Sequence, residues 1–338
     1  MRRVQILLSL AFLIFGLSAD AVSVQGQAKA SNKQVSAKSA AKKSAPGRSA
    51  ARKTPTERAV MWERVDIGSR NLFDGPGGDA MRPDLSKIEF IKEEKGGHNK
   101  KYRIKDGSGV VWVAKLGREA RPETAAVRLM WGLGYKTEIN YLVPSITIPG
   151  KGTHKNVRLE ARPDNVERLE EWKWTDNPFV GTNELQGLKM MMVFMTNWDV
   201  LDLQNKVLDV GNEHQYIVSD LGSTFGRLGN NNFPVIYRFG RQTGSPKHYI
   251  KTQFIKDVKN GEVRLAYKGK NRKLFRGFTV SQARWLSGLL GSLRDEQIRD
   301  AFRAANYSPA EITVFTTAVK NKISELENAV NGRNLAGR

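Results

Sequence analysis

The sequence predicts an α+β fold of two lobes, a strand-rich N-lobe and a helical C-lobe. Residues 86–162 hold five short segments rich in β-branched and aromatic side chains, separated by glycine, proline or aspartate. After Val166, segments with apolar residues at helical spacing dominate. A strand-rich half followed by a helical half is typical of two packed lobes with a cleft between them.

The first 21 residues have the pattern of a secretory signal peptide. Met1-Arg2-Arg3 precedes an apolar run from Val4 to Leu17, and small residues end at Ala19-Asp20-Ala21. The apolar run of 14 residues is shorter than the roughly 20 that span a bilayer, so we expect cleavage rather than a membrane anchor. The sequence therefore predicts export to a periplasmic or extracellular location, with no transmembrane span after signal removal.

Residues 22–58 predict a disordered basic linker. They are almost wholly Ala, Ser, Lys, Arg, Gln and Thr, without an aromatic residue. Nine Lys or Arg stand against one acid, Glu57, so a net +8 of the whole chain's +21 lies here. Such a segment can bind an anionic envelope polymer by counterion release, but it carries no pattern that reads nucleic-acid sequence. A solubilising linker is the simpler interpretation.

The folded domain is expected over residues 59–330, with the N-lobe at about 86–165, the C-lobe at about 166–330 and a flexible terminus at 331–338. One helix interrupts the strands of the N-lobe, beginning at Pro122 and ending at Gly134. In the C-lobe, apolar periodicity predicts helices over 184–198, 279–294, 295–306 and 308–330.

The composition excludes several kinds of site. The chain has no cysteine, which excludes disulfides, thiol nucleophiles and cysteine-ligated metals. Its four histidines are scattered without the spacing of a metal-binding pair. Any catalysis must therefore depend on carboxylates, Lys, Ser, Thr or Asn.

Residues 197–226 combine a predicted β-hairpin with side chains suited to chemistry. The hairpin brings Asn205, just before its first strand, beside Asp220, just after its second. Asp199 and Asp202 lie on the loop that enters the same end. Four oxygen-bearing side chains near one another suit a hard divalent cation and the orientation of a hydroxyl group.

This segment resembles the protein-kinase-like superfold, especially its atypical branches, the phosphatidylinositol kinases, HipA-type kinases and secretory-pathway kinases. Those families have a catalytic Asp, an Asn five residues later, a hairpin, and an Asp-x-Gly whose Asp binds Mg²⁺. The resemblance implies a catalytic role for Asp199 and magnesium-binding roles for Asn205 and Asp220, which Leu221-Gly222 follows. Asp199 and Asn205 are six residues apart, so Asp202 is an alternative catalytic residue.

The strand-rich half supplies further matching residues in the same order. One predicted strand ends in Ala-Lys at Lys115, which resembles the Val-Ala-x-Lys strand whose Lys reaches the nucleotide phosphates. The resemblance implies Glu123, on the next helix, as its ion-pair partner, with Glu119 as second choice. It also places Gly96 and Gly97 in a turn over the phosphates, although a full Gly-x-Gly-x-x-Gly is absent.

Each of these residues also has a purely structural explanation. Lys115 suits a surface position at a strand end, and an isolated Asp suits a helix cap or a turn. The order of the residues along the chain favours the kinase-like interpretation over these explanations. Trp172 and Trp174 indicate core packing rather than a platform for sugars.

The resemblance implies an exported phosphotransferase that binds ATP and Mg²⁺ between its lobes. The acceptor is not identified by the sequence, although the basic residues of segment 237–276 suit either an anionic substrate or a solvated surface. Two alternatives remain open. One is a catalytically silent kinase-like binding module anchored by its basic linker, and the other is a glycan hydrolase that uses Asp199 and Asp202 as a carboxylate pair.

Overall fold

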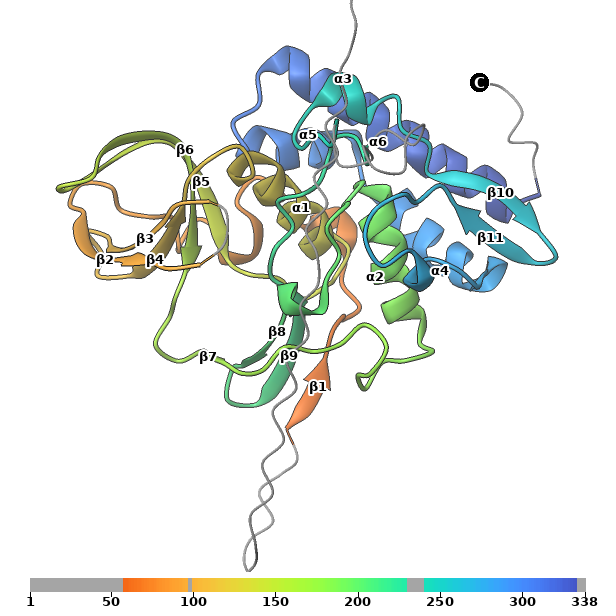
Figure 1. The fold of residues 1–338 in the computed structure, drawn as a ribbon, viewed down its shortest axis with the longest axis horizontal. Helices are drawn as coiled ribbons and strands as arrows, with labels where there is room; N and C mark the ends of the chain where they lie inside the picture. The colour runs from red at the N-terminus through yellow and green to blue at the C-terminus, as the bar shows by residue number, and fades with distance from the viewer. Residues whose placement is uncertain (1–56, 97–98, 230–239, 333–338) are drawn as a thin grey trace, which may run out of the picture. The chain divides into compact units, whose positions relative to one another are not determined.

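The computed structural model describes residues 57–96, 99–229 and 240–332 (Figure 1). The predicted signal peptide, all but the last two residues of the predicted linker, Gly97 and residues 333–338 lie outside the described residues. Among the helices that are described, none is both long enough and apolar enough to cross a bilayer.

An antiparallel five-stranded sheet forms the N-lobe, at the left of Figure 1. Its strand order is β2-β3-β4-β6-β5, and all five strands predicted from the sequence are present. Alternation along β3 places Tyr102 and Ile104 in the core and Lys105 outside, as expected for a sheet with one buried face. The strands are β2 (Glu89–Glu94), β3 (Lys101–Lys105), β4 (Val111–Lys115), β5 (Asn140–Ile148) and β6 (Gly152–Ala161).

The predicted N-lobe helix is α1 (Ala120–Gly132), which packs against β5 and β6 on one side and against α5 of the C-lobe on another. The helix ends where Gly134 takes a left-handed backbone, with φ of +98°. Gly134 also exchanges a backbone hydrogen bond with Glu63, whose amide donates to the Gly134 carbonyl over 3.0 Å. This contact fixes the chain that precedes the N-lobe against the end of α1.

The predicted hairpin of residues 197–226 lies in a second sheet of order β1-β9-β8-β7. β8 and β9 are antiparallel, with Asn205 paired to Val218, while β1 pairs in parallel with β9. β1 and β7 were not expected from the sequence, because runs of two or three residues carry no periodicity. The strands are β1 (Arg58–Val60), β7 (Glu167–Arg168), β8 (Asn205–Asp209) and β9 (Glu213–Val218).

The C-lobe contains all four predicted helices. Thr182 caps α2 through its side chain, and Ser308 with Glu311 forms the predicted capping box of α6. A short helix, α3 (Pro246–Tyr249), precedes the third sheet. The helices are α2 (Asn183–Phe194), α4 (Val280–Gly291), α5 (Asp295–Ala304) and α6 (Pro309–Val330).

The C-lobe also holds strands that the sequence analysis did not anticipate. An antiparallel sheet of order β10-β11-β12 lies beside α4 and α6, at the right of Figure 1. Its strands are β10 (Ile255–Lys259), β11 (Glu262–Leu265) and β12 (Phe278–Thr279). The described residues include four 3₁₀ turns as well, η1 (Ile67–Ser69), η2 (Gly75–Gly77), η3 (Asp202–Gln204) and η4 (Arg272–Leu274).

Gly134 tests how tightly the start of the domain is fixed to α1. A Cβ at this position would lie 2.3 Å from the Glu63 carbonyl oxygen, so we expect Gly134→Ala to lower the free energy of unfolding by about 2–4 kcal/mol. Gly150→Ala is the matched control, because φ is also positive there (+71°) but a Cβ would meet open space. We expect it to cost about 1 kcal/mol in urea unfolding, and equal costs would contradict the close approach at Gly134.

Candidate functional site

The ammonium of Lys115, at the end of β4, lies among three carboxylates. Nζ is 2.9 Å from Oε2 of Glu123, 3.2 Å from Oδ1 of Asp220 and 3.4 Å from Oε2 of Glu119. Lys115 is 2% exposed and Glu123 is fully buried. Lys115 is thus no surface lysine, and the structure brings it together with both of its predicted glutamate partners and with Asp220.

Local structure explains why these side chains meet. Glu119 is the residue before α1, and Glu123 lies in the first turn of that helix, so the two are one turn apart and face the same way. A carboxylate in the first turn is also favoured by the partial positive charge of the helix N-terminus. Asp220 follows β9, whose pairing with β8 brings it to the end of the N-lobe strand β4.

The charges in this cluster set one another's ionisation. Burial acts to lower the pKa of Lys115, but the carboxylates of Glu123 and Asp220 outweigh it and raise that pKa above its ordinary value. Burial acts to raise the pKa of Asp220, but the Lys115 ammonium and the Gly222 amide outweigh it, and the pKa is lowered. Burial raises the pKa of Glu123 to about 7, against the opposing effect of Arg158 and Lys115.

The cluster continues as a buried ring of ion pairs. Arg158 on β6 contacts both Glu123 (3.0 Å) and Glu160 (2.6 Å). Glu160 pairs with Arg162, and the Ser219 hydroxyl donates to Oε1 of Glu138 over 2.8 Å. Because Ser219 directly precedes Asp220 in the chain, this hydrogen bond connects the Glu138 end of the ring back to the Lys115 end. Its charged members are the cations Lys115, Arg158, Arg162 and Arg168 and the carboxylates Glu119, Glu123, Glu138, Glu160 and Asp220.

The loop before β8 packs directly on the segment that follows Asp220. The Phe225 amide donates to the Met195 carbonyl over 2.7 Å, and Thr196 and Phe225 both have left-handed backbones, with φ of +55° and +53°. Non-glycine residues in this conformation cost about 1–3 kcal/mol each and cluster at functional sites. Gly222 in this segment packs closely on a different element, because a Cβ there would lie 2.7 Å from Cβ of Glu119, just before α1.

The structure distinguishes the two candidate catalytic aspartates. The Asp199 carboxylate forms an ion pair with Lys270 and accepts a hydrogen bond from Nε2 of Gln204 at 3.1 Å. Asp202 is exposed, and its Oδ1 accepts a hydrogen bond from the Trp174 amide at 3.0 Å. Asp202 therefore has a structural contact with the Trp174 segment, whereas Asp199 directly follows Trp198, whose amide donates to the Ser223 carbonyl over 3.3 Å.

Lys270 is a site residue that the sequence analysis gave no role. It lies on the loop after β11, and its backbone amide donates to the Trp198 carbonyl over 2.9 Å. The sequence offered no signal for it, because Lys270 is one of many cations in segment 237–276.

Asn205 and Asp220 have the unsatisfied oxygens that a divalent cation requires. Asn205 is fully buried and donates from Nδ2 to the Trp172 carbonyl over 2.9 Å, while its Oδ1 has no hydrogen-bond partner among the described residues. The contacts of Asp220 with Lys115 and Gly222 both use Oδ1, and its side chain is 41% exposed. An amide oxygen and a carboxylate oxygen are ligands that Mg²⁺ prefers, so these residues fit the ion that the resemblance implies.

The predicted glycine turn is only partly described. Gly96 has a left-handed backbone with φ of +101° and open space around it, and Gly97 lies outside the described residues. Asn99, just after the turn, donates a hydrogen bond from Nδ2 to Glu119. The end of the turn therefore reaches the carboxylates around Lys115.

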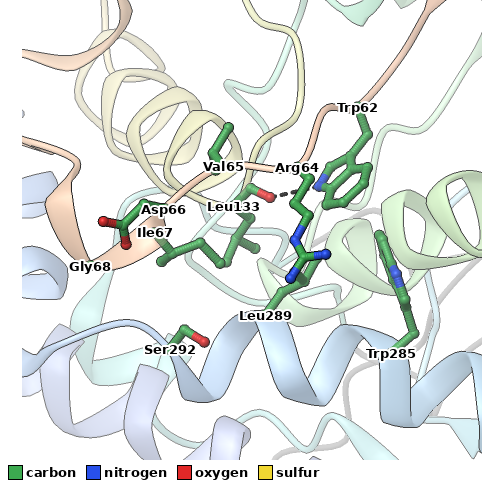
Figure 2. Close-up of a pocket in the computed structure, with 10 residues that line it drawn as sticks. All are labelled: Trp62, Arg64, Val65, Asp66, Ile67, Gly68, Leu133, Trp285, Leu289 and Ser292. Carbon is green, nitrogen blue, oxygen red and sulfur yellow. Dashed lines mark hydrogen bonds between the residues drawn. The ribbon is translucent and has the colours of Figure 1, made fainter.

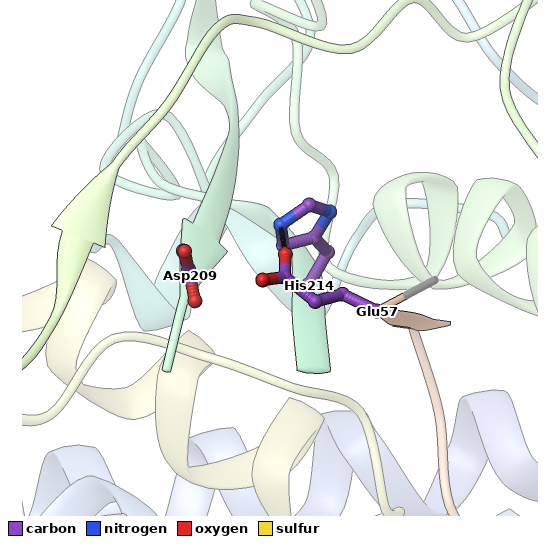
Figure 3. Close-up of side chains that lie close together, drawn as sticks. All are labelled: Glu57, Asp209 and His214. Atoms are coloured by element: carbon purple, nitrogen blue, oxygen red, sulfur yellow. Dashed lines mark ion pairs between the residues drawn. The ribbon is translucent and has the colours of Figure 1, made fainter. Parts of the chain in front are cut away.

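Two other features of the described residues lie apart from the predicted site. A pocket of about 420 Å³ between residues 62–68, Leu133 and α4 contains none of the predicted site residues (Figure 2). Glu57, just before β1, gathers with Asp209 and His214 of the neighbouring strands β8 and β9 (Figure 3). Cross-strand pairing and the ion pair between Glu57 and His214 account for this cluster.

Trp172 and Trp174, which a glycan hydrolase would need as an exposed platform for sugars, are core residues. Trp172 and Trp174 are 3% and 1% exposed, and their rings pack edge to face at 4.9 Å. In this buried position they cannot stack on a sugar. This agrees with the core packing expected from the sequence.

Several solved structures are similar to this chain at low sequence identity. The similar structures include a Helicobacter pylori proinflammatory kinase, CtkA, at 10% identity and a TM-score of 0.43, which covers 74% of this chain and 95% of that chain. The Golgi casein kinase matches at 9% identity and a TM-score of 0.38, covering 76% of this chain and 75% of that chain. Its structure with Mn and ADP bound matches at 11% and 0.37, covering 76% of each chain. No family model matches the sequence, and no curated protein is significantly similar to it.

The two-lobed α+β fold predicted from the sequence is confirmed by the sheets and helices described above.

The lowered pKa of Asp220 predicts a pH dependence of stability. The ionised carboxylate stabilises the folded state, so the stability of the wild type relative to Asp220→Asn should be fully present above about pH 4, the range of an unfolded Asp. It should be lost as the pH falls through the lower pKa of the folded state. Urea unfolding at a series of pH values measures this difference.

Lys115→Gln gives the control for that titration. Without the ammonium, the pKa of Asp220 should move upward, and the loss of stability should begin at a higher pH. A difference between wild type and Asp220→Asn that stays constant across the acidic range would contradict the ion pair.

Proposed function

We propose that the chain is a kinase-like phosphotransferase that binds Mg-ATP beside Lys115 and Asp220. The observation that carries this proposal is the meeting of Lys115, Glu123 and Asp220, which come from β4, α1 and the second residue after β9. A buried ammonium held by a helix glutamate, next to an Asp-x-Gly aspartate, is the arrangement that protein kinases use to hold nucleotide phosphates. A purely structural ion pair would not require unsatisfied oxygens nearby, such as those of Asn205 and Asp220.

The residues have separable roles in this proposal. Lys115 binds a phosphate oxygen of the nucleotide while Glu123 keeps the ammonium in place. Asn205 and Asp220 hold Mg²⁺, which supplies neutralisation of the phosphate charge. Asp199 accepts a hydrogen bond from the acceptor hydroxyl, and Lys270 holds the Asp199 carboxylate in position.

The proposed reaction is the transfer of a terminal phosphoryl group to a hydroxyl. A bond forms between the acceptor oxygen and the γ-phosphorus, the bond from that phosphorus to its bridging oxygen breaks, and the hydroxyl proton passes to Asp199. ADP and the phosphorylated acceptor leave. The enzyme contributes positioning and charge stabilisation rather than covalent chemistry.

We also propose that the chain acts after export, on the basis of its first 21 residues. ATP is scarce outside bacterial cells, which keeps the silent binding module as the alternative to an active enzyme. The hydrolase has less support, because Asp202 bonds the Trp174 amide and both tryptophans are buried.

Thermal unfolding with and without Mg-ATP tests the nucleotide site. We expect Mg-ATP at about a hundred times its Kd to stabilise the wild type by roughly 2.7 kcal/mol. Asp220→Ala should lose this stabilisation, and Asp202→Ala, the matched control on the exposed 3₁₀ turn, should keep it. Absence of stabilisation in the wild type at millimolar Mg-ATP would refute the nucleotide site.

A second measurement separates catalysis from nucleotide binding. Asp199→Asn should keep the stabilisation by Mg-ATP but lower the rate of phosphoryl transfer by about 10²–10⁴-fold, because it removes the group that accepts the proton. Asp202→Asn should transfer at nearly the wild-type rate. Transfer of labelled phosphate, to an added acceptor or to the chain itself, reports the rate, and equal losses in the two variants would exclude Asp199 as the specific catalytic residue.

A further inference from the structure

A basic groove lies beside β11 in the C-lobe. It has a volume of about 1130 Å³ and is lined by residues 262–268, by parts of segment 272–277 and by two residues of segment 253–256. Four of its lining cations are exposed and form no ion pair among the described residues. These are Lys256, Lys268, Arg272 and Arg276.

The acidic groups near the groove do not neutralise these cations. Glu262 is the single acid among the lining residues. The nearby Asp257 forms a bidentate ion pair with Arg264. The groove therefore offers several positive charges to a ligand.

The loop that lines this groove also contacts the catalytic loop. Besides the contacts of Lys270 with Asp199 and Trp198, Asn271 donates from Nδ2 to the Val200 carbonyl over 2.9 Å. A Cβ at Gly269 would lie 2.8 Å from Cα of Trp198, so the two loops are in close backbone contact. The loop that joins the lining residues Lys268 and Arg272 thus connects the groove to Asp199.

The strand at the base of the groove favours a polypeptide as the occupant. β11 pairs with β10 along its length, but with β12 only at Glu262 and Val263. Beyond Val263, this edge of β11 has no partner strand among the described residues, and Arg264 and Leu265 line the groove there. An extended peptide can add main-chain hydrogen bonds to such an edge, which a glycan or a nucleic acid cannot do in the same way.

We propose that the groove binds an acidic segment of a protein substrate and presents its Ser or Thr hydroxyl to Asp199. This inference rests on the proposed phosphotransferase function and names the substrate class of that site. The cations of the groove attract the acidic side chains, and the edge of β11 holds the peptide backbone. The transferred phosphoryl group ends on the peptide oxygen, with the proton passing to Asp199 as above.

Peptide binding to the full chain, without nucleotide, tests the groove directly. The probe is a fluorescein-labelled peptide with Glu at alternate positions around one Ser, and its anisotropy gives Kd at about 0.1 M salt, where surface charges are partly screened. In the groove variant, four exposed cations become Gln, and we expect Kd to rise about tenfold or more. The substitutions are Lys256→Gln, Lys268→Gln, Arg272→Gln and Arg276→Gln.

A control variant carries the same change of net charge elsewhere. Its four positions are exposed, lie outside the groove and form no ion pair among the described residues. We expect its Kd to stay within about twofold of the wild type, because distant surface charges are screened. The substitutions are Lys87→Gln, Lys105→Gln, Lys155→Gln and Arg299→Gln.

Two further arms separate this inference from the proposed function. Asp220→Ala should bind the peptide as the wild type does even though it loses Mg-ATP, so a failed nucleotide site leaves this measurement intact. The groove variant should keep its stabilisation by Mg-ATP, which also shows that it is folded, and should lose phosphorylation of the acidic peptide.

Three results would overturn the inference. One is an equal loss of affinity in the groove and control variants, which would assign binding to the overall charge. Another is equally tight binding of a peptide with Gln in place of Glu. The third is groove-dependent binding of inorganic polyphosphate or a single-stranded oligonucleotide that exceeds the binding of the acidic peptide, which would assign the groove to a different polymer.

Discussion

The buried ammonium of Lys115 is the constraint on which the arrangement of the site depends. A charge that is 2% exposed is tolerated only when carboxylates surround it, and removal of one partner of such a pair typically costs about 3–5 kcal/mol. Its partners come from α1 and from the second residue after β9. The sheet, the helix and the hairpin must therefore hold one relative position, and that position brings Asp220, Asn205 and the Asp199 loop into the same region.

The charge balance of the ring leaves negative charge on its more open side. When all are ionised, its five carboxylates exceed its four cations by one. The interior pairs are well matched, since Arg158 lies between Glu123 and Glu160. The more open carboxylates are those of Glu119 and Asp220, with side chains 21% and 41% exposed, so the excess negative charge lies where a hydrated cation can approach.

The sequence predicted the elements with strong periodicity and the site residues whose order along the chain is distinctive. The N-lobe strands are rich in β-branched and aromatic residues between turn residues and the C-lobe helices have apolar residues at helical spacing, so both were found, whereas β7 and β12, with two residues each, give no pattern. Lys115, Glu123 and Asp220 were found through their order. Arg158 and Glu160 were missed, because charged residues on a strand indicate a solvent-facing side when their partners are unknown. The choice between Asp199 and Asp202 needed the contacts with Lys270 and Trp174, which no spacing contains.

The distance along the chain between the partners of Lys115 also bears on how the protein folds. Asp220 lies 105 residues after Lys115. Closing a loop of this length costs roughly 4 kcal/mol of chain entropy, so the contact with Asp220 is favourable only after the intervening strands and α2 have formed. Glu123, eight residues from Lys115, can meet it early. The cluster around Lys115 is thus completed late in folding, and neither lobe contains it alone.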